Sequence, residues 1–260
     1  MTAGERRPLA GLRVLVTRPE ARAGGLAAAI RQAGGEALIC PTLRLEPVTP
    51  SEEGVARAAE AGVVVFVSPA AVEHGLDFLP RDGAERLTVG AVGAGTAAAL
   101  AEKGWPCQLL PVHSSDSEGL LAHPDLAAAK VAGRRVVIVR GNGGRALLAD
   151  TLTARGAAVE YLEVYARHRV AFDGALAAGA DIVTVTSSEG LEALVQGVTD
   201  DQRARLLGRP LVTSGSRVSA AARKAGFQNR ILTAAEPGNG GLLAAIIELA
   251  PTASGASGQV

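Results

Sequence analysis

The sequence predicts an α/β protein with two similar, doubly wound parallel-sheet domains, one inserted in the other. Three observations support this prediction. Short β-branched apolar runs alternate with Ala-rich helical stretches along nearly the whole chain. An internal repeat recurs at an offset of 122 residues. The length of 260 residues suits two domains, at roughly 150 residues per domain.

Six strand-to-helix units follow one another along the chain. Uninterrupted apolar strands that lead directly into helices are typical of parallel sheets with helices on both faces. In chain order, the expected strand and helix ranges are 14–16 and 25–33, 63–67 and 69–79, 89–92 and 96–103, 136–139 and 145–155, 182–185 and 189–195, and 211–213 and 218–225. Ligands of such folds bind beyond the carboxyl ends of the strands.

The repeat has a permuted order, which indicates the domain arrangement. The matched segments are 14–18 with 136–140, 67–69 with 186–188, and 89–121 with 211–243. The unit that begins the chain thus matches a unit late in the other copy. Such an order arises when one domain is built from both ends of the chain and the other is inserted within it.

The domain boundaries follow from this arrangement. We expect residues 1–41 and 168–260 to form one discontinuous domain and residues 48–160 to form the inserted domain. Residues 42–47 and 161–167 are extended segments that run between the domains in opposite directions. They predict a two-stranded antiparallel connection that acts as a hinge, with an interdomain cleft of the kind that ligands prefer.

Composition excludes several classes of partner. Lys and Arg total 26 and Asp and Glu total 26, so the chain lacks the basic surplus that nucleic acids and anionic membranes attract. Aromatic residues make up only 3%, which argues against stacking on bases. Only three of the cations are Lys. Genome composition or a carboxylate-rich ligand can explain that bias, because guanidinium groups suit carboxylates.

Membrane, redox and metal signals are weak. The longest apolar run, Val63 to Val67, is far shorter than the ~20 residues of a membrane span. The N-terminus has no signal-peptide pattern, so we expect a cytoplasmic protein. Cys40 and Cys107 are far apart and the four His are scattered, so neither a disulfide framework nor a metal site is indicated.

Two local motifs have competing explanations. Residues 93–98 match GxGxxA, the dinucleotide fingerprint, but no acidic residue ends the following strand as that site requires. Nucleotide binding therefore stays a minor alternative. The carboxylates Asp116, Glu118 and Asp125 can form a site, but the simpler explanation is a helix over 118–122 capped by Ser117.

The strand ends carry the strongest functional signal. They combine hydroxyls, amides and guanidiniums and contain almost no carboxylates. Each hydroxyl alone can be a helix N-cap, but together these groups suit a polyanion. The candidate binding residues are Thr17, Arg18, Ser68, Gly93, Thr96, Arg140, Gly141, Asn142, Arg145, Ser187, Ser188, Ser214 and Arg217.

Several of these segments resemble the uroporphyrinogen-III synthase family. The resemblance covers residues 12 to 247 in the right order, and the segments that carry it are 14–26, 66–72, 92–97, 116–121, 139–145, 164–165 and 186–191. It implies a two-lobed, cofactor-free, monomeric lyase of porphyrin and heme biosynthesis. Such an enzyme dehydrates the linear tetrapyrrole hydroxymethylbilane and closes the ring, with the last pyrrole inverted through a spiro intermediate. That substrate is rich in carboxylates.

The resemblance also implies roles for single residues. It makes Tyr165 the proton donor to the leaving hydroxyl, a role worth ~10²–10⁴ in rate for a general acid. A hinge residue that packs between the lobes is the open alternative for Tyr165. Arg217 stands where the family often has a hydroxyl, which makes it a candidate carboxylate partner. A non-catalytic two-lobed binding protein for a small polyanion is the alternative function.

Overall fold

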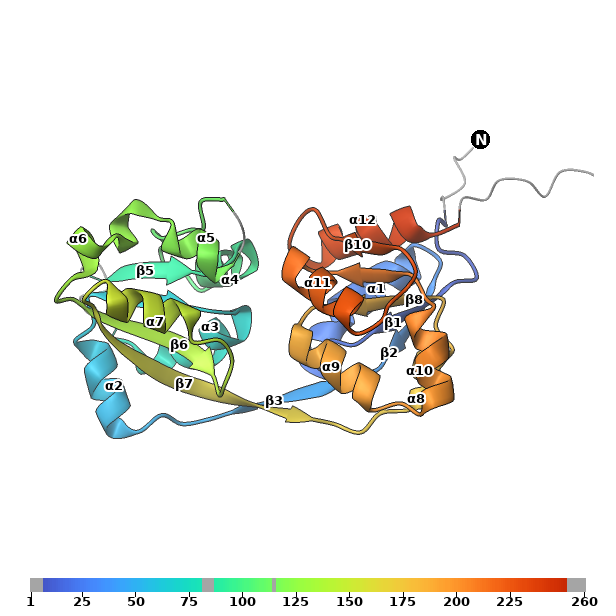
Figure 1. The fold of residues 1–260 in the computed structure, drawn as a ribbon, viewed down its shortest axis with the longest axis horizontal. Helices are drawn as coiled ribbons and strands as arrows, with labels where there is room; N and C mark the ends of the chain where they lie inside the picture. The colour runs from blue at the N-terminus through green and yellow to red at the C-terminus, as the bar shows by residue number, and fades with distance from the viewer. Residues whose placement is uncertain (1–6, 81–86, 114–115, 252–260) are drawn as a thin grey trace, which may run out of the picture. The chain divides into compact units, whose positions relative to one another are not determined.

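The computed structural model describes residues 7–80, 87–113 and 116–251 (Figure 1). The chain divides into two compact units. Unit 1 comprises residues 1–44 and 168–260, and unit 2 comprises residues 45–167. Each unit contains a sheet, with every strand pair parallel in unit 1 and the pairs among β5, β4, β6 and β7 parallel in unit 2, so the predicted α/β class is confirmed. The ends of the predicted first domain, 1–6 and 252–260, lie outside the described residues.

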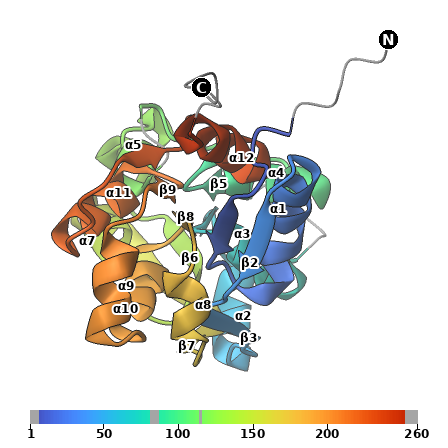
Figure 2. The ribbon, with the colours of Figure 1, turned by 90° about the vertical axis from the view of Figure 1, so that its right-hand side faces the viewer.

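Unit 1 is built on the sheet β10-β9-β8-β1-β2, in which every neighbouring pair is parallel. Its strands are β1 (Arg13–Val16), β2 (Glu36–Ile39), β8 (Ile182–Val185), β9 (Leu211–Thr213) and β10 (Ile231–Thr233). Its helices are α1 (Glu20–Gln32), α8 (Gly174–Ala178), α9 (Ser188–Gln196), α10 (Asp200–Leu207), α11 (Ser216–Lys224) and α12 (Gly238–Leu249). They cover both faces of the sheet (Figure 2).

The alternation of side chains along β1 divides the core of unit 1 in two. Val14 and Val16 pack with α1 and α12 on one face. Leu15 packs with α8, α9, α10 and α11 on the other face. A strand buried on both faces needs apolar residues at every position, which explains the uninterrupted run in the sequence.

Unit 2 is built on the sheet β3-β7-β6-β4-β5. Its strands are β3 (Leu43–Pro47), β4 (Val63–Phe66), β5 (Thr88–Ala91), β6 (Arg135–Gly141) and β7 (Ala158–Arg169). Its α-helices are α2 (Glu52–Ala59), α3 (Pro69–Gly75), α4 (Ala94–Glu102), α5 (Ser117–Leu121), α6 (Ala128–Val131) and α7 (Leu147–Ala154), and the described residues also form 3₁₀ turns at Leu76–Phe78 and Pro124–Leu126. Residues of α2, α3 and α4 pack on one face and those of α5, α6 and α7 on the other.

Apart from β3, an additional edge strand of unit 2, the two sheets share one strand order. A single parallel bridge between Gly90 and Leu109 adds an extended segment beside β5. Unit 2 then has the order Leu109 segment-β5-β4-β6-β7, and unit 1 has the order β10-β9-β8-β1-β2. In unit 2 the chain forms β4, β5 and the Leu109 segment before β6 and β7, whereas in unit 1 it forms β1 and β2 before β8, β9 and β10, so the two orders are circular permutations of each other. β6 in unit 2 therefore holds the place that β1 holds in unit 1.

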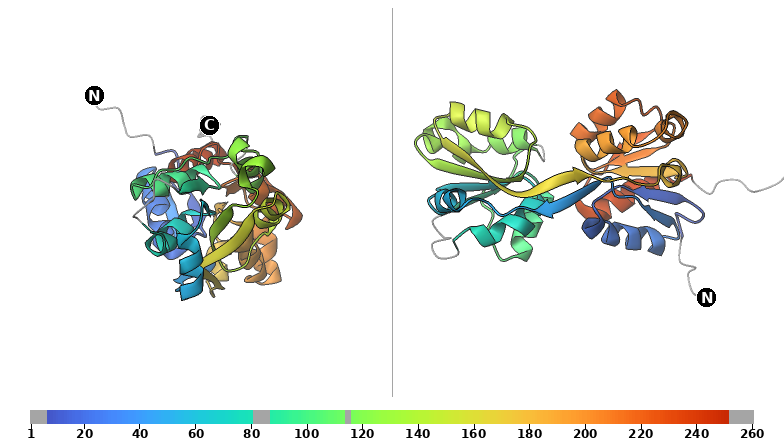
Figure 3. Two further views of the ribbon diagram at one scale, coloured as in Figure 1. Left: turned by 90° about the vertical axis from the view of Figure 1, so that its left-hand side faces the viewer. Right: turned by 90° about the horizontal axis from the view of Figure 1, so that it is seen from below.

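The chain crosses between the units through β3 and β7, which are neighbours in the second sheet (Figure 3). β3 leads from unit 1 into unit 2, and β7 leads back. β7 also pairs in parallel with β6 from Ala158 to Tyr165. Much of segment 161–167, which we expected to form a separate connection, is therefore part of the sheet of unit 2.

The structure corrects several element boundaries. α1 begins at Glu20, earlier than the expected 25–33. Ser117 does not cap the helix predicted at 118–122. Asp116 caps it instead, with its Oδ1 accepting the Gly119 N–H at 2.8 Å. A carboxylate one residue earlier in the chain fits the cap position as well as a hydroxyl does. No helix within the described ranges is long and apolar enough to cross a membrane.

Candidate functional site

The candidate residues lie at or near the carboxyl ends of the strands in both units. Because the strands are parallel, these ends meet at one edge of each sheet. In unit 1 this edge carries Thr17, Arg18, Ser187, Ser188, Ser214 and Arg217. In unit 2 it carries Ser68, Gly93, Thr96, Arg140, Gly141, Asn142, Arg145 and Tyr165. The two edges differ in how many of their polar side chains already bind other groups of the protein.

Tyr165 contacts several of the other residues at the edge of the sheet in unit 2. The side chain is 2% exposed and belongs to the core that packs on α2, α3 and α4. Its phenolic oxygen accepts a hydrogen bond from Nη2 of Arg167 at 2.8 Å. It shares a second hydrogen bond, of 3.1 Å, with Oγ of Ser68. A buried phenol with two polar partners is held in one orientation.

A β-bulge turns Tyr165 into the core. Along β6 and β7, Arg140 pairs with Glu163, but the next residue, Gly141, pairs with Tyr165. Val164 is therefore an extra residue in β7. In a regular strand neighbouring side chains point to opposite faces. Here Val164 and Tyr165 both belong to the cluster that packs with α2, α3 and α4 on one face of the sheet, because a bulge re-aims the side chains that follow it.

Gly141 provides the space that the tyrosine ring occupies. A Cβ atom added at position 141 would lie 2.6 Å from Cζ of Tyr165. Any larger residue would therefore displace the ring. Gly141, predicted to bind substrate, contributes to the site by seating Tyr165.

Ser68 links the tyrosine to a helix terminus. It is the N-cap of α3, and its Oγ accepts the Ala71 N–H at 3.1 Å. Pro69 begins the helix, where its lack of an N–H costs nothing. The ring of His74, in the same helix, lies 5.9 Å from the ring of Tyr165, centroid to centroid. The hydroxyl of Ser68 is thus both a cap and a direct partner of the phenol.

Asn142 fastens the end of β6 to the end of β7. Its backbone N–H donates to the Tyr165 carbonyl at 2.9 Å. Its side-chain Oδ1 accepts the Arg167 N–H at 2.9 Å, and its carbonyl accepts from Nη1 of Arg167 at 2.8 Å. These bonds fix the backbone around the tyrosine and hold the Arg167 guanidinium in place.

Arg140 is a buried cation held by neutral groups. It is 7% exposed, and its Nε donates to the Gly141 carbonyl at 3.0 Å. Its guanidinium carbon lies 4.3 Å from the centroid of the Tyr161 ring. No carboxylate of the described residues forms an ion pair with it. Burying a cation is costly without a counter-charge, so Arg140 is suited to bind an anion.

Arg145 differs from Arg140 because the fold supplies its carboxylate. Its Nη2 lies 2.5 Å from Oε1 of Glu118, and both side chains are about half exposed. The hydrogen bond from Arg145 lowers the pKa of the Glu118 carboxyl below its usual value. An anionic ligand would have to compete with Glu118 for this guanidinium.

Gly93 and Thr96 open α4. Gly93 is extended (φ −166°) and Thr96 is 4% exposed, with its backbone N–H donating to the Gly93 carbonyl at 3.0 Å. The helix-forming turn after β5 therefore exists as predicted. Asp116, the first acidic residue after the extended segment that follows α4, caps α5.

In unit 1 the hydroxyls are used within the fold. Thr17 Oγ1 donates to the Thr184 carbonyl at 2.8 Å. Ser187 caps α9 by accepting the Gly190 N–H at 3.0 Å. Ser214 donates to the Thr186 carbonyl at 3.0 Å. The simpler explanation, that each hydroxyl satisfies the local backbone, accounts for these three contacts.

The other candidates of unit 1 are Arg18, Arg217 and Ser188, and their surroundings differ. Arg18 donates from Nη1 to Oδ1 of Asn239 at 2.7 Å. Burial, and then the nearby charge of Arg22, lower the pKa of the Arg18 guanidinium from its usual value. Arg217 is exposed in the first turn of α11, and Ser188 is half-buried at the start of α9.

Sequence reasoning missed three residues that contact the candidates: Arg167, His74 and Asn239. Arg167 was detectable, since it follows Tyr165 by two positions in a strand and such residues share a face. The contacts of His74 and Asn239 depend on tertiary packing and have no local signal. Metal-ligand clusters of three or more His, Cys, Asp or Glu are absent from the part of the chain that the structure describes.

Comparison with known proteins identifies the family. A family model described as uroporphyrinogen-III synthase HemD matches residues 25–244. This chain belongs to the uroporphyrinogen-III synthase family. The uroporphyrinogen-III synthase of Escherichia coli K12 is 33% identical over 246 residues, which cover 90% of this chain and 99% of that protein. The Salmonella typhimurium protein is 34% identical over 248 residues, with the same two coverages. The resemblance seen in the sequence is confirmed.

Solved structures agree on the fold of this family member. A uroporphyrinogen III synthase variant from the extremely thermophilic bacterium Thermus thermophilus matches with a TM-score of 0.63 and 19% identity, covering 92% of this chain and 98% of that chain. The Helicobacter pylori protein titled uroporphyrinogen-III synthetase matches with a TM-score of 0.58 and 12% identity, covering 92% and 99%. At these identities the matches support the α/β architecture alone.

Proposed function

We propose that this chain is a uroporphyrinogen-III synthase, a lyase that dehydrates and cyclises hydroxymethylbilane with inversion of the last pyrrole ring. The observation that carries the proposal is the family match over residues 25–244. It is reinforced by relatives of that name that align over 99% of their length. A non-catalytic binding protein for a small polyanion is not favoured, because these relatives are named as synthases.

The proposed mechanism requires only modest acid catalysis by the protein. The pyrrole nitrogen helps to expel the hydroxyl of the hydroxymethyl group, which leaves an electrophilic azafulvene. Tyr165 supplies the proton that turns the departing oxygen into water, within the ~10²–10⁴ range for a general acid. Closure through a spiro intermediate then depends on how the terminal ring is held, because orientation selects between the two possible closures.

The carboxylates of the substrate need cations and N–H donors. Arg140 is the first candidate in unit 2, since its buried guanidinium has neutral partners only. Arg18 and Arg217 are the corresponding candidates in unit 1, supported by the hydroxyl of Ser188 and by the amides that follow the strands. Arg145 is a weaker candidate because it already binds Glu118.

The proposed function involves no cofactor, nucleic acid or membrane. Tyr165 and Ser68 supply hydroxyls and the strand ends supply N–H donors, so the proposed reaction calls for no cofactor. We propose a monomer in the cytoplasm that acts on a small molecule and binds neither nucleic acid nor membrane. The balanced charge of the chain supports the last two points.

The test is a product assay. Hydroxymethylbilane is supplied to the purified protein, the uroporphyrinogens are oxidised, and the type I and type III uroporphyrin isomers are separated. We expect mainly type III, formed faster than in buffer alone. Type I alone, formed at the rate seen in buffer, would contradict the proposal.

A further inference from the structure

We propose that Arg167 is a positioning residue for the dehydration step, acting through the phenol of Tyr165. This inference rests on the proposed function and adds a residue to it. Arg167 follows Tyr165 on the same strand, and its guanidinium carbon lies 5.0 Å from the centroid of the Tyr165 ring. Its Nη2 reaches the phenolic oxygen at 2.8 Å.

The donors and acceptors around the phenol leave one of the two hydroxyl protons without an acceptor among the described residues. A guanidinium can only donate, so the phenolic oxygen of Tyr165 is the acceptor toward Arg167. Oγ of Ser68 is likewise the acceptor toward the Ala71 N–H, at 3.1 Å. One hydrogen bond of 3.1 Å joins the two hydroxyls. If Ser68 donates it, the proton of Tyr165 remains available, and if Tyr165 donates it, the proton of Ser68 does.

Arg167 therefore donates to the phenolic oxygen of Tyr165 and offsets the negative charge that proton transfer leaves on that oxygen. In the proposed step the C–O bond of the hydroxymethyl group breaks, and the phenolic proton moves to the departing oxygen to form water. The phenolic oxygen is left with a negative charge. The Arg167 guanidinium, already in hydrogen-bond contact, balances that charge without rearrangement, as preorganised donors do. Proton loss from the cyclised product restores the phenol.

The surroundings keep the Arg167 guanidinium in this position. Nη1 donates to the Asn142 carbonyl at 2.8 Å, and the backbone N–H donates to Oδ1 of the same residue at 2.9 Å. Two side-chain hydrogen bonds, to Asn142 and Tyr165, and one backbone hydrogen bond thus hold Arg167 in place, so little conformational entropy is lost when charge develops. The arrangement predicts an effect on the chemical step and not on substrate affinity.

A double-mutant cycle separates this role from direct substrate binding. Arg167→Met should lower kcat about tenfold or more, close to the lower end of the general-acid range, and leave KM within about twofold. In a Tyr165→Phe background the same change should lower kcat by less than about twofold, because the group through which Arg167 acts is gone. Arg167→Lys, which keeps a donor, should recover part of the rate.

The matched control is Arg169→Met, the same substitution at the next same-face position of β7. Arg169 contacts Gln196 and Glu192, so kcat should stay close to wild type. The proposal would be overturned by independent, multiplicative losses in the cycle, or by an Arg167→Met effect confined to KM. It would also be overturned if the loss of rate matched a loss of folded protein measured by circular dichroism.

A spectroscopic measurement tests the hydrogen bond without relying on activity. The chain has two tyrosines, so a Tyr161→Phe background leaves Tyr165 as the sole tyrosine signal and keeps an aromatic ring beneath Arg140. The phenol C–O vibration in the Raman spectrum should shift when Arg167→Met removes the donor and should not shift with Arg169→Met. An unchanged spectrum contradicts the inference even if type III product forms. A wild-type enzyme that makes only type I product contradicts the proposed function instead.

Discussion

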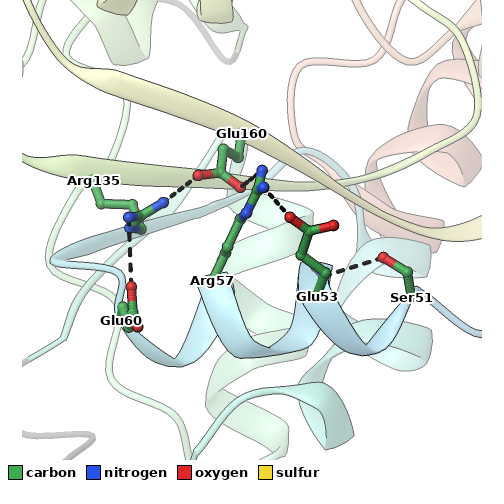
Figure 4. A network of polar contacts seen from close by, with 7 residues as sticks. Ser51, Glu53, Arg57, Glu60, Arg135 and Glu160 are labelled. Carbon is green, nitrogen blue, oxygen red and sulfur yellow. Dashed lines mark hydrogen bonds and ion pairs between the residues drawn. The ribbon is translucent and has the colours of Figure 1, made fainter.

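Two arginines on one strand, Arg135 at the start of β6 and Arg140 near its end, meet opposite surroundings. Arg135 pairs with Glu60 at 3.4 Å and with Glu160. Glu160 also binds Arg57, at 3.2 Å, and Arg57 binds Glu53 (Figure 4). Arg140 has a carbonyl and an aromatic ring as its neighbours. Along a single strand the protein therefore balances charge at one end and leaves a buried cation near the other.

We therefore expect the amino end of β6 to contribute to stability and its carboxyl end to contribute to the reaction. At the amino end, carboxylates alternate with guanidiniums, and the network ties α2 to the starts of β6 and β7. Such a network affects folding and offers nothing to an anionic ligand. At the carboxyl end, Tyr165 and Ser68 share a hydrogen bond, and Arg140 is a buried cation with neutral partners. Substitutions at the two ends should therefore change different measured quantities.

The largest effect on activity is expected at the phenol. Tyr165→Phe removes the proton donor that we propose but keeps the ring that fills the core, so kcat should fall by ~10²–10⁴ if the phenol acts as a general acid. The melting temperature should change little. Steady-state kinetics and thermal unfolding measure the two quantities. Tyr161→Phe is the matched control, and a Tyr165→Phe enzyme as fast as that control would remove Tyr165 from the mechanism.

Gly141→Ala should displace the Tyr165 ring without changing the phenol group itself. The added methyl would lie 2.6 Å from Cζ of Tyr165, so the ring must move, and overpacking of this kind costs about 1–3 kcal/mol. We expect lower kcat together with a lower melting temperature. Gly95→Ala is the control at the same sheet edge, since its nearest neighbour would be Cγ of Pro69 at 3.9 Å. Equal activity in the two variants would show that the position of the ring does not matter.

Arg140 should influence binding more than the chemical step. Arg140→Gln removes a buried cation that we assign to a substrate carboxylate, and a hydrogen bond to a charged group is worth about 1.5–3 kcal/mol. KM should rise roughly tenfold or more, with a smaller change in kcat. Arg140→Lys should restore little, because an ammonium lacks the planar fork. A rise in kcat/KM, or none of these changes, would exclude Arg140 as a substrate ligand.

The smallest expected effect on activity is at the amino end. Glu160→Gln removes the carboxylate shared by Arg57 and Arg135 and should lower stability by about 1 kcal/mol, since part of the network is exposed. The melting temperature should fall by a few degrees. kcat and KM should match wild type. A loss of activity in the still-folded variant would break the division between the two ends.

Local pattern was sufficient for much of the fold and for placing the candidate residues at the ends of strands. The apolar runs at β1, β4 and β6 were found because strands buried on both faces must be apolar throughout. Helix starts were less accurate, as α1 and α5 show. Asp116 and Ser117 are both good caps, and the sequence alone does not choose between them.

The local sequence pattern did not predict how the candidate side chains are oriented. The bulge at Val164 that buries Tyr165 comes from pairing with β6, and alternation along β7 gives no sign of it. The pairing of Arg145 with Glu118 joins residues 27 positions apart. Arg140 and Arg145 looked equivalent in the sequence, and only tertiary contacts distinguish the buried cation from the paired one.

The most direct test of the account is the isomer ratio formed by three proteins in parallel: wild type, Tyr165→Phe and Glu160→Gln. With hydroxymethylbilane as substrate, wild type and Glu160→Gln should form type III product at the same rate. Tyr165→Phe should form it much more slowly. Type I product from wild type at the rate seen in buffer, or equal rates of type III formation from all three proteins, would contradict the assignment of the chemistry to the carboxyl end of the second sheet.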